Sequence, residues 1–151
     1  MFKSWCVSQK FNNASNLSHV LMDGGVLSVP FDKLNLFYEK YIEAVKKGEK
    51  LFIVEQKSDT YNFFVDLDYK GEKSLPIDET KEICKIICDK VKRHGGKDCL
   101  ISVAPPKKSG SKIKTGIHLN WHGMVVDQVS AIALREHILV ALTRANGSSD
   151  W

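Results

Sequence analysis

Residues 63–68 read FFVDLD, a run in which apolar and acidic side chains alternate. Successive side chains of a β-strand point to opposite faces of a sheet, so the odd-numbered apolar positions share one face, and Asp66 and Asp68 share the other. Two carboxylates about 4 Å apart repel each other by roughly 4 kcal/mol at an effective dielectric constant of about 20, so such a pair usually holds a cation. Carboxylate oxygens suit Mg²⁺ or Mn²⁺. The alternative is an edge strand whose two acids simply face water.

The composition is that of an ordinary globular domain. The chain has 151 residues, of which 43% are hydrophobic and 26% are charged. Its net charge of +4 permits a polyanionic partner without requiring one. Residues 1–10 contain no apolar run typical of a signal peptide, and no stretch is apolar for the roughly eighteen residues that a membrane span needs. We therefore expect a soluble intracellular protein with no membrane partner and with reduced cysteines.

The first 60 residues predict a small α/β extension. A Gly-Gly pair between two short apolar runs in residues 20–29 predicts a hairpin, because glycine readily adopts positive φ. Residues 32–47 carry apolar side chains at helical spacing, with Asp32 as the expected N-cap. Residues 51–55, LFIVE, predict a short buried strand. We expect these elements to form an N-terminal extension over residues 1–60.

From residue 61 onward the patterns predict the order strand, helix, strand, strand, helix. The expected elements after the FFVDLD strand are a helix at 78–93, a strand at 99–104, a polar loop at 107–115, a strand at 116–121 and a helix at 127–145. This order is the split βαβ of ferredoxin-like domains without its final strand. We therefore predict an α+β fold with an RRM-like core over residues 61–151, truncated at its C-terminal end.

Polar side chains that alternate with apolar ones should meet on the open face of this core. The helices of such a domain cover one face of the sheet and leave the other open. The polar alternates expected on the open face are Asp66, Asp68, Ser102, His118 and Asn120. Acids and a histidine therefore converge on one surface, which predicts a functional site there.

The segment before the His118 strand is rich in lysine and predicts a phosphate-binding cluster. It carries Lys107, Lys108, Lys112 and Lys114. A positive cluster beside a metal-binding face would attract a polyphosphate, and a histidine can donate a hydrogen bond to a phosphate oxygen. The alternative for the lysines alone is a solvated hairpin. We assign nucleotide binding to His118, Lys112, Lys114 and Ser102.

Zinc is not expected. Four possible ligands are Cys84, Cys88, His94 and Cys99, but zinc sites normally use short knuckles rather than two thiols on the apolar stripe of a helix. His19 and His122 are isolated in the sequence, and isolated histidines are usually surface or capping residues.

Four blocks of sequence carry a family resemblance. In order, they read SHVLMDGG, KKGEKLFIVEQK, FFVDLDYK and KTGIHLNWHGMVVD. The third and fourth resemble the first two signatures of the archaeo-eukaryotic primase superfamily, a hydrophobic strand ending in Asp-x-Asp and a strand with a small-x-His motif. All four together resemble the N-terminal primase domain of the primase-helicases of nucleocytoplasmic large DNA viruses. The similarity runs from about His19 to Trp151.

The resemblance implies roles for three residues. Asp66 and Asp68 would bind the catalytic Mg²⁺ or Mn²⁺ ions, and His118 would contact the phosphates of the incoming nucleotide. The implied fold is an RRM-like core with an N-terminal α/β extension. The implied partners are a single-stranded DNA template, nucleoside triphosphates and a C-terminal helicase region of the same polypeptide. The implied location is the cytoplasm or the viral replication site of a host cell.

One part of the family pattern has no match. The third signature is an acidic residue on the following strand, and Asp150, in the sequence SSDW, has no hydrophobic strand before it. We therefore expect the third acid to lie beyond residue 151 and the chain to be weakly active or inactive by itself.

The leading hypothesis is the nucleotidyltransferase domain of a DNA primase, using two-metal-ion catalysis. The alternative is a non-catalytic nucleic-acid or nucleotide-binding module, since RRM-like sheets bind single strands. Such a module should present aromatic side chains on its open face, where this sequence offers Phe64 but mainly acids. A metal-dependent nuclease is a weaker third hypothesis, because hydrolysis needs no triphosphate-binding lysines.

Overall fold

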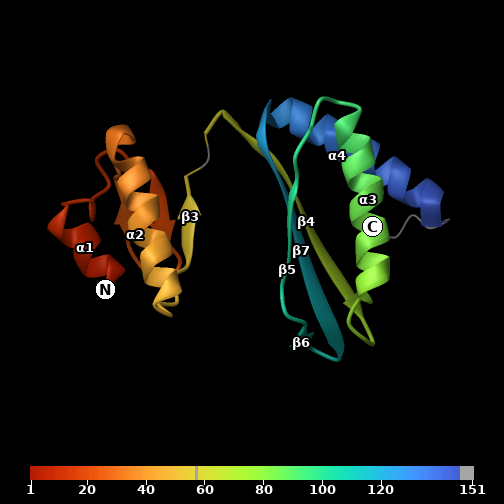
Figure 1. Cartoon of the computed structure of the whole chain (residues 1–151), viewed down its shortest axis with the longest axis horizontal. Helices are drawn as coiled ribbons and strands as arrows, with labels where there is room; N and C mark the ends of the chain where they lie inside the picture. The colour runs from red at the N-terminus through yellow and green to blue at the C-terminus, as the bar shows by residue number, and fades with distance from the viewer. Residues whose placement is uncertain (57, 147–151) are drawn as a thin grey trace. The chain divides into compact units, whose positions relative to one another are not determined.

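The structure, a computed structural model, describes residues 1–56 and 58–146. The chain divides into two compact units, one spanning Met1–Ser58 and the other beginning at Asp59. Within the described residues there are two antiparallel sheets and four α-helices (Figure 1), which agrees with the predicted α+β class. No helix in this described part is both long and apolar enough to cross a membrane.

The first unit is a three-stranded sheet with two helices. Its elements are α1 (Phe2–Ser8), β1 (His19–Leu21), β2 (Val26–Leu27), the 3-10 turn η1 (Phe31–Lys33), α2 (Leu34–Lys46) and β3 (Ile53–Glu55). The sheet order is β2-β1-β3, and β1 is antiparallel to both neighbours. The predicted hairpin is confirmed, and Gly24 and Gly25 in its turn have φ values of 104° and 116°.

Two details of this unit differ from the sequence expectation. Asp32 does not cap α2, because the chain enters the helix through η1 and Lys33 occupies the N-cap position. The strand expected at 51–55 is shorter and is not buried, since Val54 is 48% exposed. β3 lies at the edge of the sheet, and edge strands need no apolar cover on both faces.

His19 is a core residue, and the expectation of a surface or capping position is wrong. It is 2% exposed, its ring centroid lies 4.7 Å from that of Phe37, and its Nδ1 atom lies 2.9 Å from Ser18 Oγ. Among the described residues its Nε2 atom has no hydrogen-bond partner. Burial lowers the pKa of His19, which favours the neutral ring.

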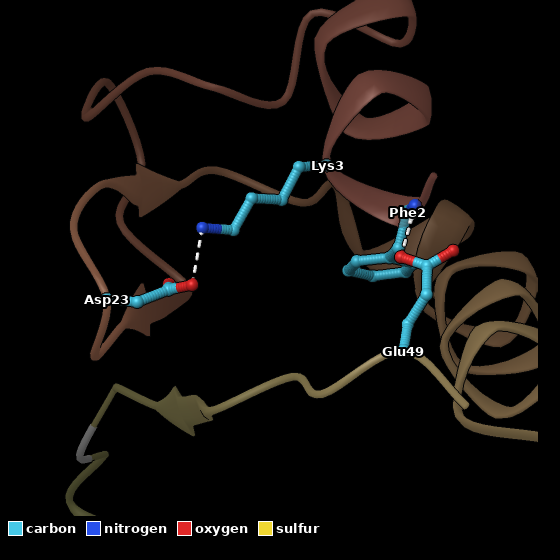
Figure 2. A network of polar contacts seen from close by, with 4 residues as sticks. All are labelled: Phe2, Lys3, Asp23 and Glu49. Carbon is cyan, nitrogen blue, oxygen red and sulfur yellow. Dashed lines mark hydrogen bonds and ion pairs between the residues drawn. The ribbon is translucent and has the colours of Figure 1, made fainter.

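A hydrogen bond and an ion pair connect α1 to the rest of the first unit (Figure 2). The backbone N–H of Phe2 donates to Glu49 Oε2 at 3.0 Å, and Lys3 Nζ lies 2.6 Å from Asp23 Oδ2 in the hairpin turn. The Phe2 ring is buried and packs edge-on against Phe37 of α2. The N-terminal helix is therefore part of this unit's core.

The second unit is a larger sheet with two helices on one face (Figure 1). Its elements are β4 (Thr60–Gly71), α3 (Ile77–Lys92), β5 (Leu100–Val103), β6 (Lys107–Ser109), β7 (Lys112–Asp127) and α4 (Gln128–Asn146). The strand order is β4-β7-β5, with every pairing antiparallel, and β6 pairs with the start of β7. The chain thus passes from β4 through α3 to β5, on the far side of β7.

β7 extends further in both directions than the expected strand at 116–121. The segment expected to be a polar loop is a hairpin, in which β6 and the start of β7 are joined at Gly110, whose φ is 62°. Beyond Trp121 the pairing with β4 shifts register and then resumes. Gly123 lies in this irregular stretch with a φ of 85°, and its N–H donates to Asn62 Oδ1 at 3.1 Å.

The division of the FFVDLD strand into two faces is confirmed. Phe63 is buried, and Val65 and Leu67 pack against the same core, whereas Asp66 and Asp68 are exposed. The core joins the apolar face of the sheet to both helices through Ile117, Leu119, Trp121, Ile87, Val91, Leu134, Ile138 and Leu142. Burial of this face fixes which side of the sheet stays open.

The packing of α3 on the sheet can be tested by replacing isoleucine with alanine at a buried and at an exposed position of this helix, in two separate variants. Ile87 is fully buried in the core, so Ile87→Ala should lower the free energy of unfolding by about 2–5 kcal/mol. Ile77→Ala is the matched control, because Ile77 is 61% exposed and should change it by no more than about 0.5 kcal/mol. Urea unfolding monitored by circular dichroism measures both, and equal effects would contradict this packing.

Candidate functional site

The open face of the second unit carries polar side chains in rows that cross the strands. Paired residues of neighbouring strands project to the same face of a sheet. Asp66 on β4 pairs with His118 on β7, and His118 pairs with Ser102 on β5. Three of the predicted site residues, from three strands, therefore form one row.

The next row places a glycine beside the second acid. Asp68 pairs with Gly116, and the N–H of Ala104 donates to the carbonyl of Gly116 at 2.9 Å. A Cβ atom at Gly116 would lie 3.6 Å from Asp68 Oδ1. A methyl group would therefore fit, but any longer side chain would project over the open face next to the carboxylate.

The third row consists of lysines. Lys70 on β4 pairs with Lys114 on β7, and Lys114 pairs with Lys107 on β6. Lys112 lies one row further, opposite Ser109, while Lys108 pairs with Ile113 and belongs to the other face. Lys70 was not predicted as a site residue, although its position two residues after Asp68 places it on the acidic face of β4.

The rows enclose a small pocket of about 320 Å³. It is lined by Asp66, Asp68, Ala104, Pro105, Lys107, Lys114, Gly116 and His118. Both predicted metal ligands, the predicted histidine and Lys114 therefore meet in one place. Ser102 and Lys112, which were also predicted to bind nucleotide, are not among the lining residues.

Each acid in the pocket has a basic neighbour from β7. Lys114 Nζ lies 2.5 Å from Asp68 Oδ2, and His118 Nδ1 lies 3.3 Å from Asp66 Oδ1. The hydrogen bond from Lys114 lowers the pKa of Asp68, so this carboxylate stays ionised well below neutral pH. In this arrangement Lys114 is the counter-ion of Asp68.

The donor set suits a hard divalent cation. Asp66 and Asp68 are about half exposed and face the same pocket, so water and a ligand can reach both carboxylates. Mg²⁺ is usually bound through one or two carboxylates, with waters and substrate phosphates completing its shell. Within residues 1–56 and 58–146 no group of three or more His, Cys, Asp or Glu side chains could hold a metal. Asp150 lies outside the described residues.

A larger cavity, of about 1050 Å³, lies on the opposite side of β4 and extends to α3 and α4. Asp66 and Asp68 reach it from the strand, but most of its lining is apolar. The charged groups of several strands converge on the smaller pocket. We therefore place the candidate site there.

The cysteines considered as zinc ligands are free thiols. Burial raises the pKa of Cys84 and Cys88, and raises that of Cys99 to about 12. Burial thus favours the protonated thiol at all three positions. The fourth candidate, His94, contacts His137 of α4.

The model of one protein family, described as the C962R protein N-terminal AEP domain, matches residues 18–148. AEP denotes the archaeo-eukaryotic primases. The chain belongs to this family. The match covers most of both compact units and all the candidate site residues, and it confirms the resemblance seen in the sequence. No curated protein matches the chain significantly.

The ion pair in this AEP domain can be tested by titration. Lys114→Gln should raise the pKa of Asp68 toward its ordinary value, because the substitution removes the positive charge that favours the carboxylate. Carbon-13 NMR of the aspartate carboxyl groups measures this change. Lys108→Gln is the matched control, since Lys108 lies on the other face and should leave the pKa of Asp68 unchanged. A similar shift in both variants would argue against the pairing.

Proposed function

We propose that this AEP domain is the nucleotidyltransferase domain of a DNA primase, with its site in the pocket formed by β4, β6 and β7. The observation that carries the proposal is the register of these strands, which puts an acid–histidine row, an acid–glycine row and a lysine row side by side. Membership of the AEP family supports the same chemistry. Primer synthesis joins a 3′-hydroxyl to the α-phosphate of a nucleoside triphosphate and releases pyrophosphate, so the site must bind both a divalent metal and a polyphosphate.

Asp66 and Asp68 would hold Mg²⁺ or Mn²⁺, which would polarise the reacting groups and neutralise the triphosphate. The residues of the chain position and balance these charges. A cation at Asp68 would replace the Lys114 ammonium, which already lies 2.5 Å from the carboxylate. Lys114 would then join Lys70 and Lys107 in binding phosphate oxygens.

His118 would bind the phosphates as a hydrogen-bond donor. Its Nδ1 atom lies 3.3 Å from Asp66 Oδ1, and His118 lines the same pocket as Lys107 and Lys114.

The proposal includes three further parts that follow from the primase assignment. The nucleic-acid partner would be a single-stranded DNA template, a helicase region would belong to the same polypeptide, and the protein would act at a viral replication site.

For the fold, the strand order β4-β7-β5, with α3 between β4 and β5 in the chain, supports an RRM-like split βαβ core.

A second function is favoured by the apolar end of the open face. Phe64 pairs with Asn120, which pairs with Leu100, and the Phe64 side chain is 54% exposed. An exposed aromatic ring on an open sheet can stack with a nucleic-acid base, as in non-catalytic single-strand-binding modules. Such a module would bind a single strand equally well with and without divalent metal, whereas the primase site needs the metal to bind a triphosphate.

Removing both acids tests the metal site. Asp66→Asn combined with Asp68→Asn should abolish Mn²⁺ binding while leaving the fold intact, because both side chains are exposed on the open face. Calorimetric titration with Mn²⁺ measures the binding, and circular dichroism checks the fold. Asp32→Asn combined with Asp98→Asn is the control, since it removes the same charge from exposed positions elsewhere. Undiminished Mn²⁺ affinity in the first variant would contradict the assignment of Asp66 and Asp68 as metal ligands.

Removing the histidine tests the phosphate role. His118→Ala should weaken the binding of a nucleoside triphosphate with Mn²⁺ by about 1–3 kcal/mol, the usual range for losing a hydrogen bond to a charged group. Binding of the monophosphate should suffer less. His122→Ala is the control, because His122 lies on the same strand but outside the pocket. Equal losses for the two nucleotides would show that His118 does not bind the triphosphate chain.

A further inference from the structure

Two histidines face each other in the second unit, away from the pocket on the open face. His94 lies just after α3, and His137 lies in the middle of α4. The Nε2 atom of His94 is 3.2 Å from the Nδ1 atom of His137. The ring centroids are 5.0 Å apart and the ring planes differ by 25°. Both side chains are exposed, so ions in solution can reach them.

This spacing matches that of two imidazoles bound to one metal ion. With metal–nitrogen bonds of about 2.0–2.1 Å and a near-tetrahedral angle, the two nitrogens lie about 3.2–3.4 Å apart. Each ring centroid lies about 1.2 Å behind its nitrogen, so the same arrangement separates the centroids by about 5 Å. The observed nitrogen and centroid separations are close to these values. The two rings are stacked, so these exposed side chains must turn about their torsions to point both nitrogens at one ion. Without a metal, one nitrogen must carry the proton of the contact and the other must accept it.

We propose that His94 and His137 bind one imidazole-preferring metal ion of the Zn²⁺, Ni²⁺ and Cu²⁺ class. The ring that donates the shared N–H moves its proton to its other nitrogen, so that both facing nitrogens bind the ion through lone pairs and both imidazoles stay neutral. Imidazole selects these metals, whereas carboxylates select Mg²⁺ and Mn²⁺, so this site and the acidic pocket bind different ions. In the part of the chain that the structure describes, no third ligating side chain joins the pair. Water therefore completes the coordination shell.

The bound ion would connect the end of α3 to α4. These helices pack together over the same face of the sheet, and the histidine contact joins residues 43 positions apart in the chain. A metal that binds the folded state but has no such paired site in the unfolded chain raises stability by mass action. Zn²⁺ should therefore raise the melting temperature of the protein.

The experiment is a calorimetric titration of the chain with Zn²⁺ in excess Mg²⁺, which occupies the carboxylates. We expect one Zn²⁺ per chain. Removing a residue that only hydrogen-bonds to a metal ligand lowers metal affinity by about 10–100-fold. Removing a ligand itself should cost at least as much, so His94→Gln and His137→Gln should each weaken Zn²⁺ binding at least ~tenfold. His122→Gln, an exposed histidine of β7, should leave it unchanged. The rise in melting temperature with Zn²⁺ should disappear in the first two variants alone.

Two results would overturn the proposal. One is Zn²⁺ binding that is equally tight in His94→Gln, His137→Gln and the unsubstituted chain. The other is binding that is lost in Cys88→Ser combined with Cys99→Ser but kept in the histidine variants, which would place the ion on thiols. The Asp66→Asn and Asp68→Asn double variant should lose Mn²⁺ and keep Zn²⁺, so this proposal and the primase assignment can fail independently.

Discussion

The antiparallel pairing of β4 with β7 is the constraint on which the rest of the second unit depends. Every candidate site residue lies on one of these strands or on a strand paired with β7. A slip of one residue would move every side chain of β4 to the other face. That slip would bury Asp66 and Asp68 against Ile117, Leu119 and both helices, at the high cost of burying unpaired charges. The apolar side of the sheet therefore fixes the geometry of the polar side.

β7 supplies a basic partner for each of the two acids that lie side by side on β4. Lys114 and His118 are four residues apart on this strand, and each approaches one of the two aspartates on β4. Gly116 lies between them and contributes no side chain, which keeps space open beside Asp68. Both contacts are partly exposed to solvent, and contacts of this kind contribute little to stability. Replacing Lys114 with a divalent cation would therefore cost the fold little, and the displaced ammonium would stay within one row of the acids.

The sequence predicted the parts of the fold that depend on regular alternation or helical spacing. The two faces of residues 63–68 and the buried stripe of α3 followed from periodicity. The full length of β7 did not, because the irregular pairing near Gly123 interrupts the alternation and the lysine-rich start is polar on one face. The burial of His19 depends on its contact with Phe37, which no local pattern contains. Ser102 pairs with His118, on the predicted open face, but it does not line the pocket, and which residues of a face line a pocket depends on contacts between strands that alternation alone does not give.

The rows follow one another along the open face in an order that suits a nucleotide better than a metal ion alone or a single strand of nucleic acid alone. An apolar row with Phe64 lies at one end, the two acidic rows follow, and the lysine row lies at the other end. Rows two residues apart on a strand are separated by about 6.6–6.8 Å, so this series spans about 20 Å. A nucleotide lying along the strands would place its base near the apolar row and extend its triphosphate across the acidic rows toward the lysines. A site that only bound single strands would gain nothing from the acids, because they repel the phosphates of the backbone. The acidic rows are thus the feature that separates the primase proposal from simple nucleic-acid binding.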